Sequence, residues 1–199
     1  MFSLILKVCG KKLKIRGMKF ILVECYLDRY FIHKLLNDNS RIHKATNKNE
    51  VLKKIAKDKT GSHFLIGIVD YDREDIIQNS QLRNQQYSFE LIHDGQKFKL
   101  YKGTGKPHFL FTFNPSAIEY WLIDILEVEL MINLTAYNIS GINEFQKLKT
   151  NSEKLDERIQ NMIRDILVNK ENSPTLVAFE EKLKYLIEKQ FDSNLSVLY

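Results

Sequence analysis

Three acidic residues follow two apolar runs of the sequence, and their types and spacing suit metal chemistry. Glu24 ends the run MKFILVE, and Asp70 and Asp72 end the run HFLIGIVDYD. If the two runs are neighbouring parallel strands, their carboxyl ends lie about 5 Å apart at one edge of a sheet. Asp70 and Asp72, two positions apart on an extended chain, would then point to the same side.

A shared cation would hold these carboxylates together. Negative charges at such distances repel one another unless a cation neutralises them. Oxygen ligands without nitrogen or sulfur suit Mg²⁺ or Mn²⁺. Each acid alone has a simpler interpretation, because acids at strand ends often cap helices or form turns. Occurring together, Glu24 and the D-x-D pair favour a divalent metal site.

The pattern of apolar residues predicts the elements that must position these acids. Residues 18–24 and 63–72 lack helical periodicity and predict buried strands. Residues 26–38 and 47–59 have the apolar spacing of helices. Strand, helix, helix and strand within about 50 residues indicate a parallel α/β sheet.

The remainder of the chain predicts a hairpin, one more strand and a helical tail. A D-G pair divides residues 87–102 into two alternating runs, as in a β-hairpin. Residues 109–113 predict a further strand, and Pro115 favours the start of the next helix. From Gly141 onward the chain predicts helices, at residues 142–149, 153–169 and 175–190. The sequence leaves open whether this tail packs on the sheet or forms a small lobe.

The expected fold class is α/β, with a Rossmann-like parallel sheet flanked by helices, a β-hairpin insertion and a helical C-terminal tail. Residues 18–135 form the expected α/β domain and residues 136–199 the helical extension. Residues 1–17 form a basic leader, whose five cations, without any acid, equal the whole net charge of +5. We expect native translation to start at Met18, which would make this leader non-native.

Composition and charge limit the class of protein. Residues 18–117 carry 16 basic and 11 acidic side chains, and residues 118–199 carry 9 and 14. A cationic front half could attract phosphates, although an uneven solvated surface explains the charge equally well. No apolar stretch approaches the roughly 18 residues that cross a bilayer. Two cysteines without a C-x-x-C pair predict free thiols in a reducing cytoplasm. We therefore expect a cytoplasmic protein without a membrane partner.

The acids lie in motifs that resemble a known domain. Two motifs together are similar to the Toprim domain: ILVECYLDRYF, which contains Glu24, and GIVDYDRED, which contains Asp70. The glutamate and this aspartate are 46 positions apart. Type IA and II topoisomerases, bacterial primases, overcoming-lysogenisation-defect nucleases and small ribosomal-RNA maturases share this domain. FNPSAIEYWLIDILE resembles the N-P-x-x-E-x-W-L segment of small stand-alone Toprim-like proteins linked to restriction and phage defence, often called RloB-like. The resemblance covers residues 18–130, so the expected sheet is Toprim-like.

The resemblance implies a role for each acid. Glu24 would be the general acid/base or a metal ligand, and Asp70 and Asp72 would hold Mg²⁺, or Mn²⁺ in its place. Asp28, one helical turn after Glu24, would orient it or a basic residue. Glu119 is a secondary candidate, whose alternative is a surface acid of a helix near a buried tryptophan.

The implied activity is magnesium-dependent hydrolysis of nucleic-acid phosphodiesters, a nuclease reaction in phage defence. Arg73 and Lys106, with Lys102 as a secondary candidate, would stabilise the charge that grows in the transition state. The expected partner is nucleic acid, either DNA or RNA.

Two other functions stay open. A glycine usually follows the glutamate of a Toprim domain, and Cys25 stands there in this chain, where its side chain could crowd the substrate. This departure favours a non-catalytic module that binds nucleic acid or a partner protein such as an ATPase, and a homodimer is also left open. The third function is a nucleotide-sugar transferase that holds Mn²⁺ through the D-x-D pair, in which Glu24 would have no role.

Overall fold

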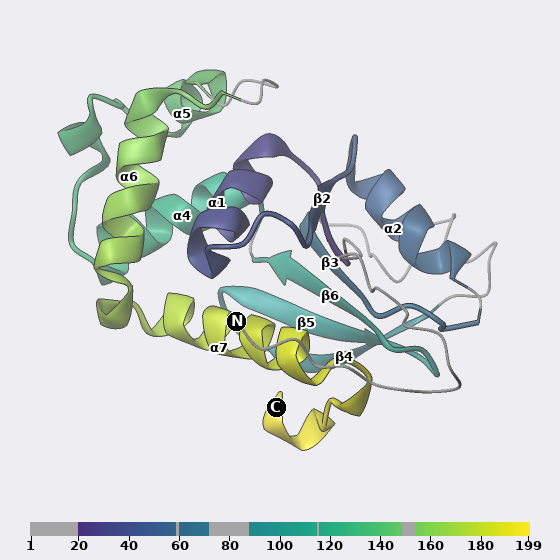
Figure 1. Ribbon diagram of the computed structural model, residues 1–199. Coiled ribbons are helices and arrows are strands. Elements are labelled where there is room, and N and C mark those ends of the chain that lie inside the picture. The colour runs from purple at the N-terminus through teal and green to yellow at the C-terminus, as the bar shows by residue number, and fades with distance from the viewer. Residues whose placement is uncertain (1–19, 59, 72–87, 115, 149–153) are drawn as a thin grey trace.

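A six-stranded sheet forms the centre of the molecule (Figure 1). The computed structural model describes residues 20–58, 60–71, 88–114, 116–148 and 154–199. The strands lie in the order β2-β1-β3-β6-β5-β4. Their bounds are Ile21–Val23 for β1, Ile42–Lys44 for β2, Leu65–Asp70 for β3, Phe89–Asp94 for β4, Phe98–Gly103 for β5 and His108–Phe113 for β6. The predicted α/β class is confirmed.

Four of the six strands are parallel, which fixes where their ends meet. β1 pairs in parallel with β2 and β3, and β3 pairs in parallel with β6. β5 runs antiparallel to both β4 and β6, so the predicted hairpin is confirmed. The carboxyl ends of β1, β2, β3 and β6 therefore lie at one edge of the sheet, with the first residues of β5. We call this the carboxyl edge.

The apolar runs form strands because both faces of the sheet are covered by helices. All six residues of β6 and all three of β1 are buried, which explains their continuous apolar sequence. The short edge strand β2, with the sequence IHK, has only one buried residue. Sequence analysis missed β2 because a strand of three residues, only one of them buried, gives no periodic signal.

Helices cover the two faces unequally. On one face lies α2 (Lys48–Lys57); on the other lie α1 (Tyr26–Leu36), α4 (Ile118–Asp124) and α7 (Pro174–Lys189) (Figure 1). A π-helical turn at Ile125–Glu129 continues α4, followed by α5 (Ile142–Leu148) and α6 (Glu157–Val168). Among the described residues, no helix has both the length and the apolar character to cross a membrane.

Capping residues set the helix boundaries. Ser173 caps α7, since its Oγ accepts a hydrogen bond from the Leu176 amide at 3.1 Å, and Pro174 occupies the first helical position. This confirms the predicted break at Ser173-Pro174. Asn47 caps α2 through the Glu50 amide at 3.0 Å. Pro115, the expected start of a helix, lies outside the described residues, and α4 begins at Ile118.

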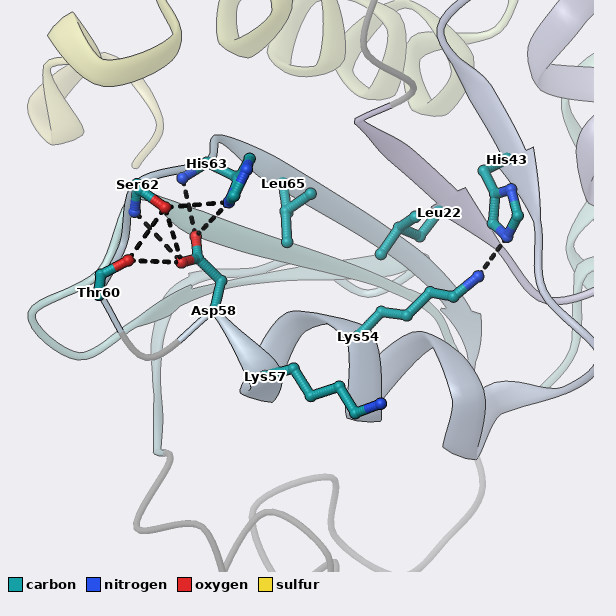
Figure 2. A pocket seen from close by; sticks show the side chains of 9 residues that line it. All are labelled: Leu22, His43, Lys54, Lys57, Asp58, Thr60, Ser62, His63 and Leu65. Carbon is teal, nitrogen blue, oxygen red and sulfur yellow. Dashed lines mark hydrogen bonds and ion pairs between the residues drawn. The ribbon is translucent and has the colours of Figure 1, made fainter.

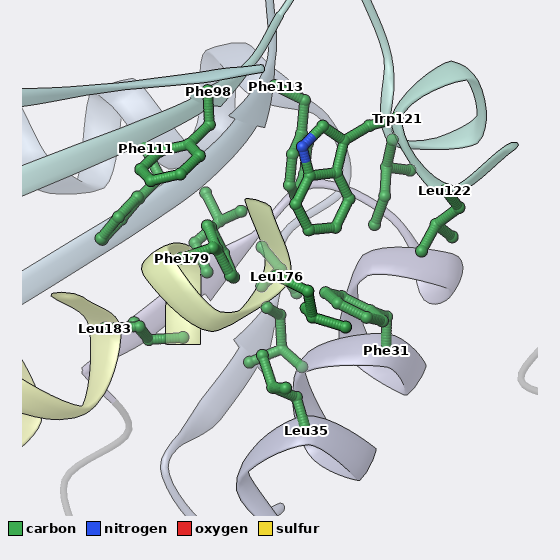
Figure 3. Close-up of a cluster of buried hydrophobic side chains, with 14 of the residues drawn as sticks. Phe31, Leu35, Phe98, Phe111, Phe113, Trp121, Leu122, Leu176, Phe179 and Leu183 are labelled. Carbon is green, nitrogen blue, oxygen red and sulfur yellow. The ribbon is translucent and has the colours of Figure 1, made fainter. Parts of the chain in front are cut away.

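Aromatic rings from helices α1, α4 and α7 and from strands β5 and β6 pack together in the larger core (Figure 3). Trp121 of α4 is buried, as predicted, with its ring centroid 4.9 Å from that of Phe113 and 5.6 Å from that of Phe31. Phe179 of α7 lies 5.4 Å from Trp121 and 5.1 Å from Phe111. The helical tail therefore packs on the sheet and shares one core with residues 18–135.

Candidate metal centre

Glu24 and Asp70 meet at the carboxyl edge. β1 and β3 are neighbours, with Val23 opposite Ile68, so the residues that follow them lie side by side. The backbone amide of Asp70 donates a hydrogen bond to Glu24 Oε2 at 3.3 Å. The structure thus brings together two of the acids that the strand-end pattern singled out.

Asp28 and Glu119 add two buried carboxyl groups to this pair. Asp28 is only 1% exposed and Glu119 only 3%. Asp28 lies in the first turn of α1, and Glu119 in the first turn of α4. Both charges act on Asp70, as the charge of Glu24 does. Glu119 is therefore part of the acidic group rather than a surface acid, the alternative left open by the sequence.

The pKa of Asp70 is strongly raised in this acidic group. Burial, and then the negative charges of Asp28, Glu24 and Glu119, raise the pKa of Asp70 to about 8. A hydrogen bond from the Ile118 amide to Asp70 Oδ1, 3.0 Å long, acts in the opposite direction. This bond also satisfies a donor at the start of α4. At neutral pH the group is stabilised by binding either a proton or a cation.

Cys25 does not occupy a backbone conformation that needs glycine. Its φ of −133° and ψ of 177° are extended, and it is the N-cap of α1. Its Sγ accepts a hydrogen bond from the Asp28 amide at 3.5 Å, and its own amide donates to Asp28 Oδ2 at 2.9 Å. The Cys25 side chain thus helps to start α1.

The other two members of the expected site, Asp72 and Arg73, lie outside the described residues. Within the described ranges, no three histidine, cysteine, aspartate or glutamate side chains are arranged to hold a metal ion by themselves. Glu24 and Asp70 nevertheless fit a hard cation, because they are oxygen donors in an acidic group where burial raises a pKa. Mg²⁺ commonly takes only one or two protein carboxylates and completes its shell with water and phosphate.

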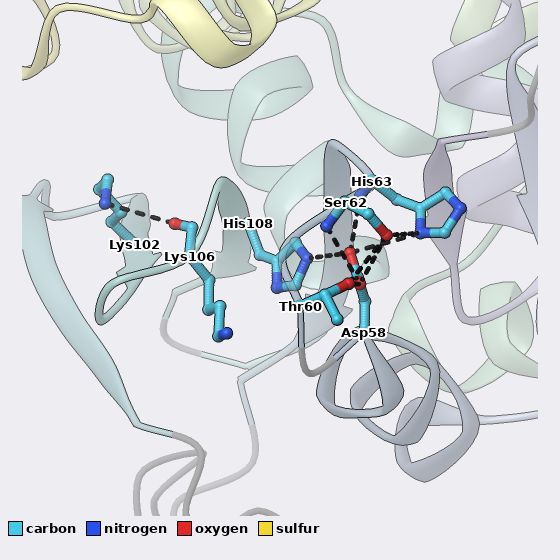
Figure 4. A network of polar contacts seen from close by, with 7 residues as sticks. All are labelled: Asp58, Thr60, Ser62, His63, Lys102, Lys106 and His108. Carbon is cyan, nitrogen blue, oxygen red and sulfur yellow. Dashed lines mark hydrogen bonds and ion pairs between the residues drawn. The ribbon is translucent and has the colours of Figure 1, made fainter.

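The structure does not bring Lys102 and Lys106 to the acids. Lys102 is opposite Phe109, near the start of β6, and its Nζ donates to the carbonyl of Lys106 at 3.3 Å (Figure 4). Asp70 is opposite the last residue of β6. The strand between these points is about 13–16 Å long, so neither lysine is placed to stabilise charge at Asp70. The spacing in sequence could not reveal this, because the β5–β6 turn lies at the edge opposite the acids.

Two other lysines lie at the carboxyl edge, and sequence analysis missed both. Lys44 ends β2, and its Nζ lies 4.3 Å from the centroid of the Tyr26 ring. Lys99 lies near the start of β5, with Nζ 5.7 Å from the Tyr71 ring centroid and 2.8 Å from a carboxylate oxygen of Asp94. Finding them requires the short strand β2 and the antiparallel direction of β5, neither of which the acid motifs encode.

A cavity of about 620 Å³ lies away from the acids, between α2 and the loop that leads into β3 (Figure 2). Lys54 hydrogen-bonds His43 there. Asp58 organises the loop: it accepts from the Ser62 and His63 amides, at 3.2 and 2.8 Å, and from buried His108 Nε2 at 3.1 Å (Figure 4). Burial acts to raise the pKa of Asp58, but these hydrogen bonds outweigh it and lower the pKa. The network is accounted for by loop structure.

Comparisons of the chain with protein-family models, curated proteins and solved structures found no match.

Proposed function

We propose that the chain is a magnesium-dependent nuclease or a related phosphoryl-transfer enzyme that acts on nucleic acid. One observation carries the proposal: Glu24 and Asp70, 46 positions apart, are hydrogen-bonded within an acidic group that raises the pKa of Asp70 to about 8. Proteins seldom bury several carboxyl groups together unless function requires it. Cytoplasmic location, which the two free thiols predict, and a role in phage defence, which the motif resemblance implies, belong to the same proposal.

Glu24, Asp70 and Asp72 are the proposed ligands of Mg²⁺ or Mn²⁺. The bound ion would neutralise a non-bridging phosphate oxygen and lower the pKa of a coordinated water. The acidic group alone would repel a polyanion, so the ion also makes phosphate binding electrostatically favourable.

The remaining roles belong to the chain itself. Glu24 would accept or donate the proton of the attacking or leaving oxygen. Asp28 is a positioning residue, because its carboxylate holds the Cys25 amide next to Glu24 at 2.9 Å. Lys44 and Lys99 replace Lys102 and Lys106 as the candidate phosphate contacts, since both lie at the carboxyl edge.

Cleavage assays test this function directly. The protein is incubated with plasmid, single-stranded DNA and RNA, in Mg²⁺, Mn²⁺ or EDTA. We expect metal-dependent cutting that falls by about 100-fold or more in Asp70→Asn and Glu24→Gln. Glu90→Gln, at an exposed position of β4, is the matched control and should cut normally. Binding without cutting would support the non-catalytic module, and cutting that persists in EDTA would refute the metal site.

A further inference from the structure

One face of α1 gathers cationic and aromatic side chains next to the acidic group. These residues recur at positions i, i+3, i+4, i+7 and i+8, which form one stripe on a helix: Tyr26, Arg29, Tyr30, His33 and Lys34. The opposite stripe, which includes Leu27 and Phe31, is buried in the core. The stripe begins two residues after Glu24 and extends about 12 Å along the helix axis.

This stripe lines two adjoining cavities that share Tyr30. The first, about 200 Å³, is bounded by Tyr26, Arg29, Tyr30, His33 and Asn39. The second, about 420 Å³, lies between α1 and α6 and includes Tyr30, Lys34, Gln160, Asn161 and Arg164. Their lining on α1 runs from Tyr26 to Lys34, and α6 lines the second cavity from the other side. We call the two cavities together the α1 track.

The track is positively charged, in contrast to the acidic group beside it. Its cations are Arg29, Lys34 and Arg164, and no described carboxylate lines either cavity. Asp165, 3.5 Å from Arg164, offsets part of this charge from outside the lining. Arg164 is 67% exposed, so its guanidinium can reach a ligand.

The aromatic rings of the track are held in place. Lys34 Nζ lies 5.4 Å from the centroid of the Tyr30 ring, and the Tyr30 hydroxyl hydrogen-bonds Gln160 Oε1 at 3.4 Å. Lys44 lies against the Tyr26 ring. Both tyrosines are half-buried. Ordered rings between cations are the combination that binds unpaired bases and the phosphates that join them.

We propose that the α1 track binds a single-stranded segment of nucleic acid and delivers it to the carboxyl edge. Bases stack on Tyr26 and Tyr30, and phosphates contact Arg29, Lys34 and Arg164. Single strands suit the track because a duplex keeps its base faces stacked and out of reach of a side chain. This inference rests on the proposed function for its substrate class, but it makes a claim about binding that needs no catalysis.

Binding in EDTA tests the track separately from cleavage. Fluorescence anisotropy measures the affinity for a labelled oligothymidylate and for a duplex of the same length. We expect the single strand to bind at least about tenfold more tightly. Lys34→Glu combined with Arg164→Glu should weaken single-strand binding by about tenfold or more and reduce the salt dependence by about two phosphates.

Matched variants separate charge and stacking effects. Lys53→Glu combined with Lys189→Glu makes the same charge change at exposed positions outside the track and should lower affinity much less. Tyr26→Leu keeps an apolar side chain but removes the ring, and it should weaken binding by about fivefold, whereas Tyr26→Phe should not. Three results would overturn the track: an equal loss of affinity in the two charge-reversed double variants, tighter binding to the duplex than to the single strand, or no binding to the oligonucleotide.

The two proposals fail in different ways. Specific binding without metal-dependent cutting would leave the track standing and refute the nuclease. Cutting that is unaffected by Lys34→Glu with Arg164→Glu, on any single-stranded substrate, would leave the nuclease standing and refute the track.

Discussion

The backbone amide of Asp70 donates a hydrogen bond to Glu24 Oε2 at 3.3 Å, although 46 positions separate the two residues. β1 and β3 are paired with Val23 opposite Ile68, so Glu24 lies level with Val69 and its carboxylate reaches the amide of the next residue, Asp70. This contact joins two separate motifs of the sequence into one acidic group. The strongest predictions concern that group.

Asp70→Asn should stabilise the metal-free protein. The folded-state pKa of Asp70 is raised to about 8, so the folded protein binds a proton more tightly than the unfolded chain does. Stability therefore falls as pH rises from about 4 to about 8. Removing the charge while keeping an oxygen for the Ile118 amide should raise the free energy of unfolding at pH 8 by on the order of 1–3 kcal/mol.

Urea unfolding in EDTA at pH 5 and pH 8 measures this effect. The gain in Asp70→Asn should be small at pH 5 and larger at pH 8. Glu90→Gln, outside the acidic group, controls for loss of a carboxylate. A loss of stability at pH 8 would show that the Asp70 carboxylate is favourable where it lies.

Mg²⁺ should stabilise the protein most at a pH where protons compete least for the Asp70 carboxylate. At 100 times its dissociation constant, a ligand specific for the folded state contributes about 2.7 kcal/mol. We expect a higher melting temperature with Mg²⁺ at pH 8, a smaller increase at pH 5 and none in Asp70→Asn, measured by differential scanning calorimetry. The same increase in Asp70→Asn would place any magnesium site elsewhere.

Asp58→Asn should destabilise the protein by about 2–4 kcal/mol, because it weakens hydrogen bonds to buried His108 and to the loop before β3. Burial lowers the pKa of His108 below its ordinary value of 6.5, and this effect outweighs the hydrogen bond and charge of Asp58, which raise it. Stability linked to His108 is present above pH 6.5 and falls as pH drops below it. The lowered pKa of Asp58 adds a second loss below about pH 4.

Thermal unfolding between pH 3 and pH 7 would measure both effects of this network. Asp94→Asn, on an exposed carboxylate of β4, is the control and should change stability by about 0.5 kcal/mol or less. If the stability of Asp58→Asn depended on pH as that of the unchanged protein does, the pH dependence would not arise from Asp58 and His108.

Phe179→Ala should lower the free energy of unfolding by about 3–5 kcal/mol. Phe179 is fully buried among Phe111, Phe113 and Trp121, although it belongs to the tail that the sequence left unplaced. Val128→Ala, at a side chain that is 57% exposed, should change stability by about 0.5 kcal/mol or less in the same denaturant titration. If Phe179→Ala lowered the free energy of unfolding no more than Val128→Ala does, the tail would not be part of the core.

The strands of the sheet, and the acids at their ends, can be predicted from the sequence because buried strands have a recognisable pattern. Parallel strands buried on both faces must be continuously apolar, so residues 18–24 and 63–72 were recognisable, and a D-G pair identified the hairpin. The short strand β2 gives no such signal. The positions of Lys44 and Lys99 depend on which strand pairs with which, and long-range pairing is not encoded locally.

Burial was also hard to predict for single residues. Glu119 reads as a surface acid in an amphipathic helix, but it is buried because α4 begins against Asp70. The α7 packing site for Phe179 likewise depends on a core assembled from four segments distant in sequence. Lys106 lies in the turn between β5 and β6, and its position in the sequence does not tell at which edge of the sheet that turn lies.

Cys25→Gly tests whether the thiol beside Glu24 limits the proposed activity. Cys25 has extended backbone angles, and its Sγ is directed at the Asp28 amide, 3.5 Å away, as part of the α1 cap. Glycine would lose this weak cap and destabilise the protein by about 0.5 kcal/mol, whereas Cys25→Ser would keep it. Because the Sγ points toward the helix, we expect both variants to cleave nucleic acid at the rate of the unchanged protein. A rate increase of about tenfold in Cys25→Gly alone would show instead that the thiol crowds the substrate at Glu24.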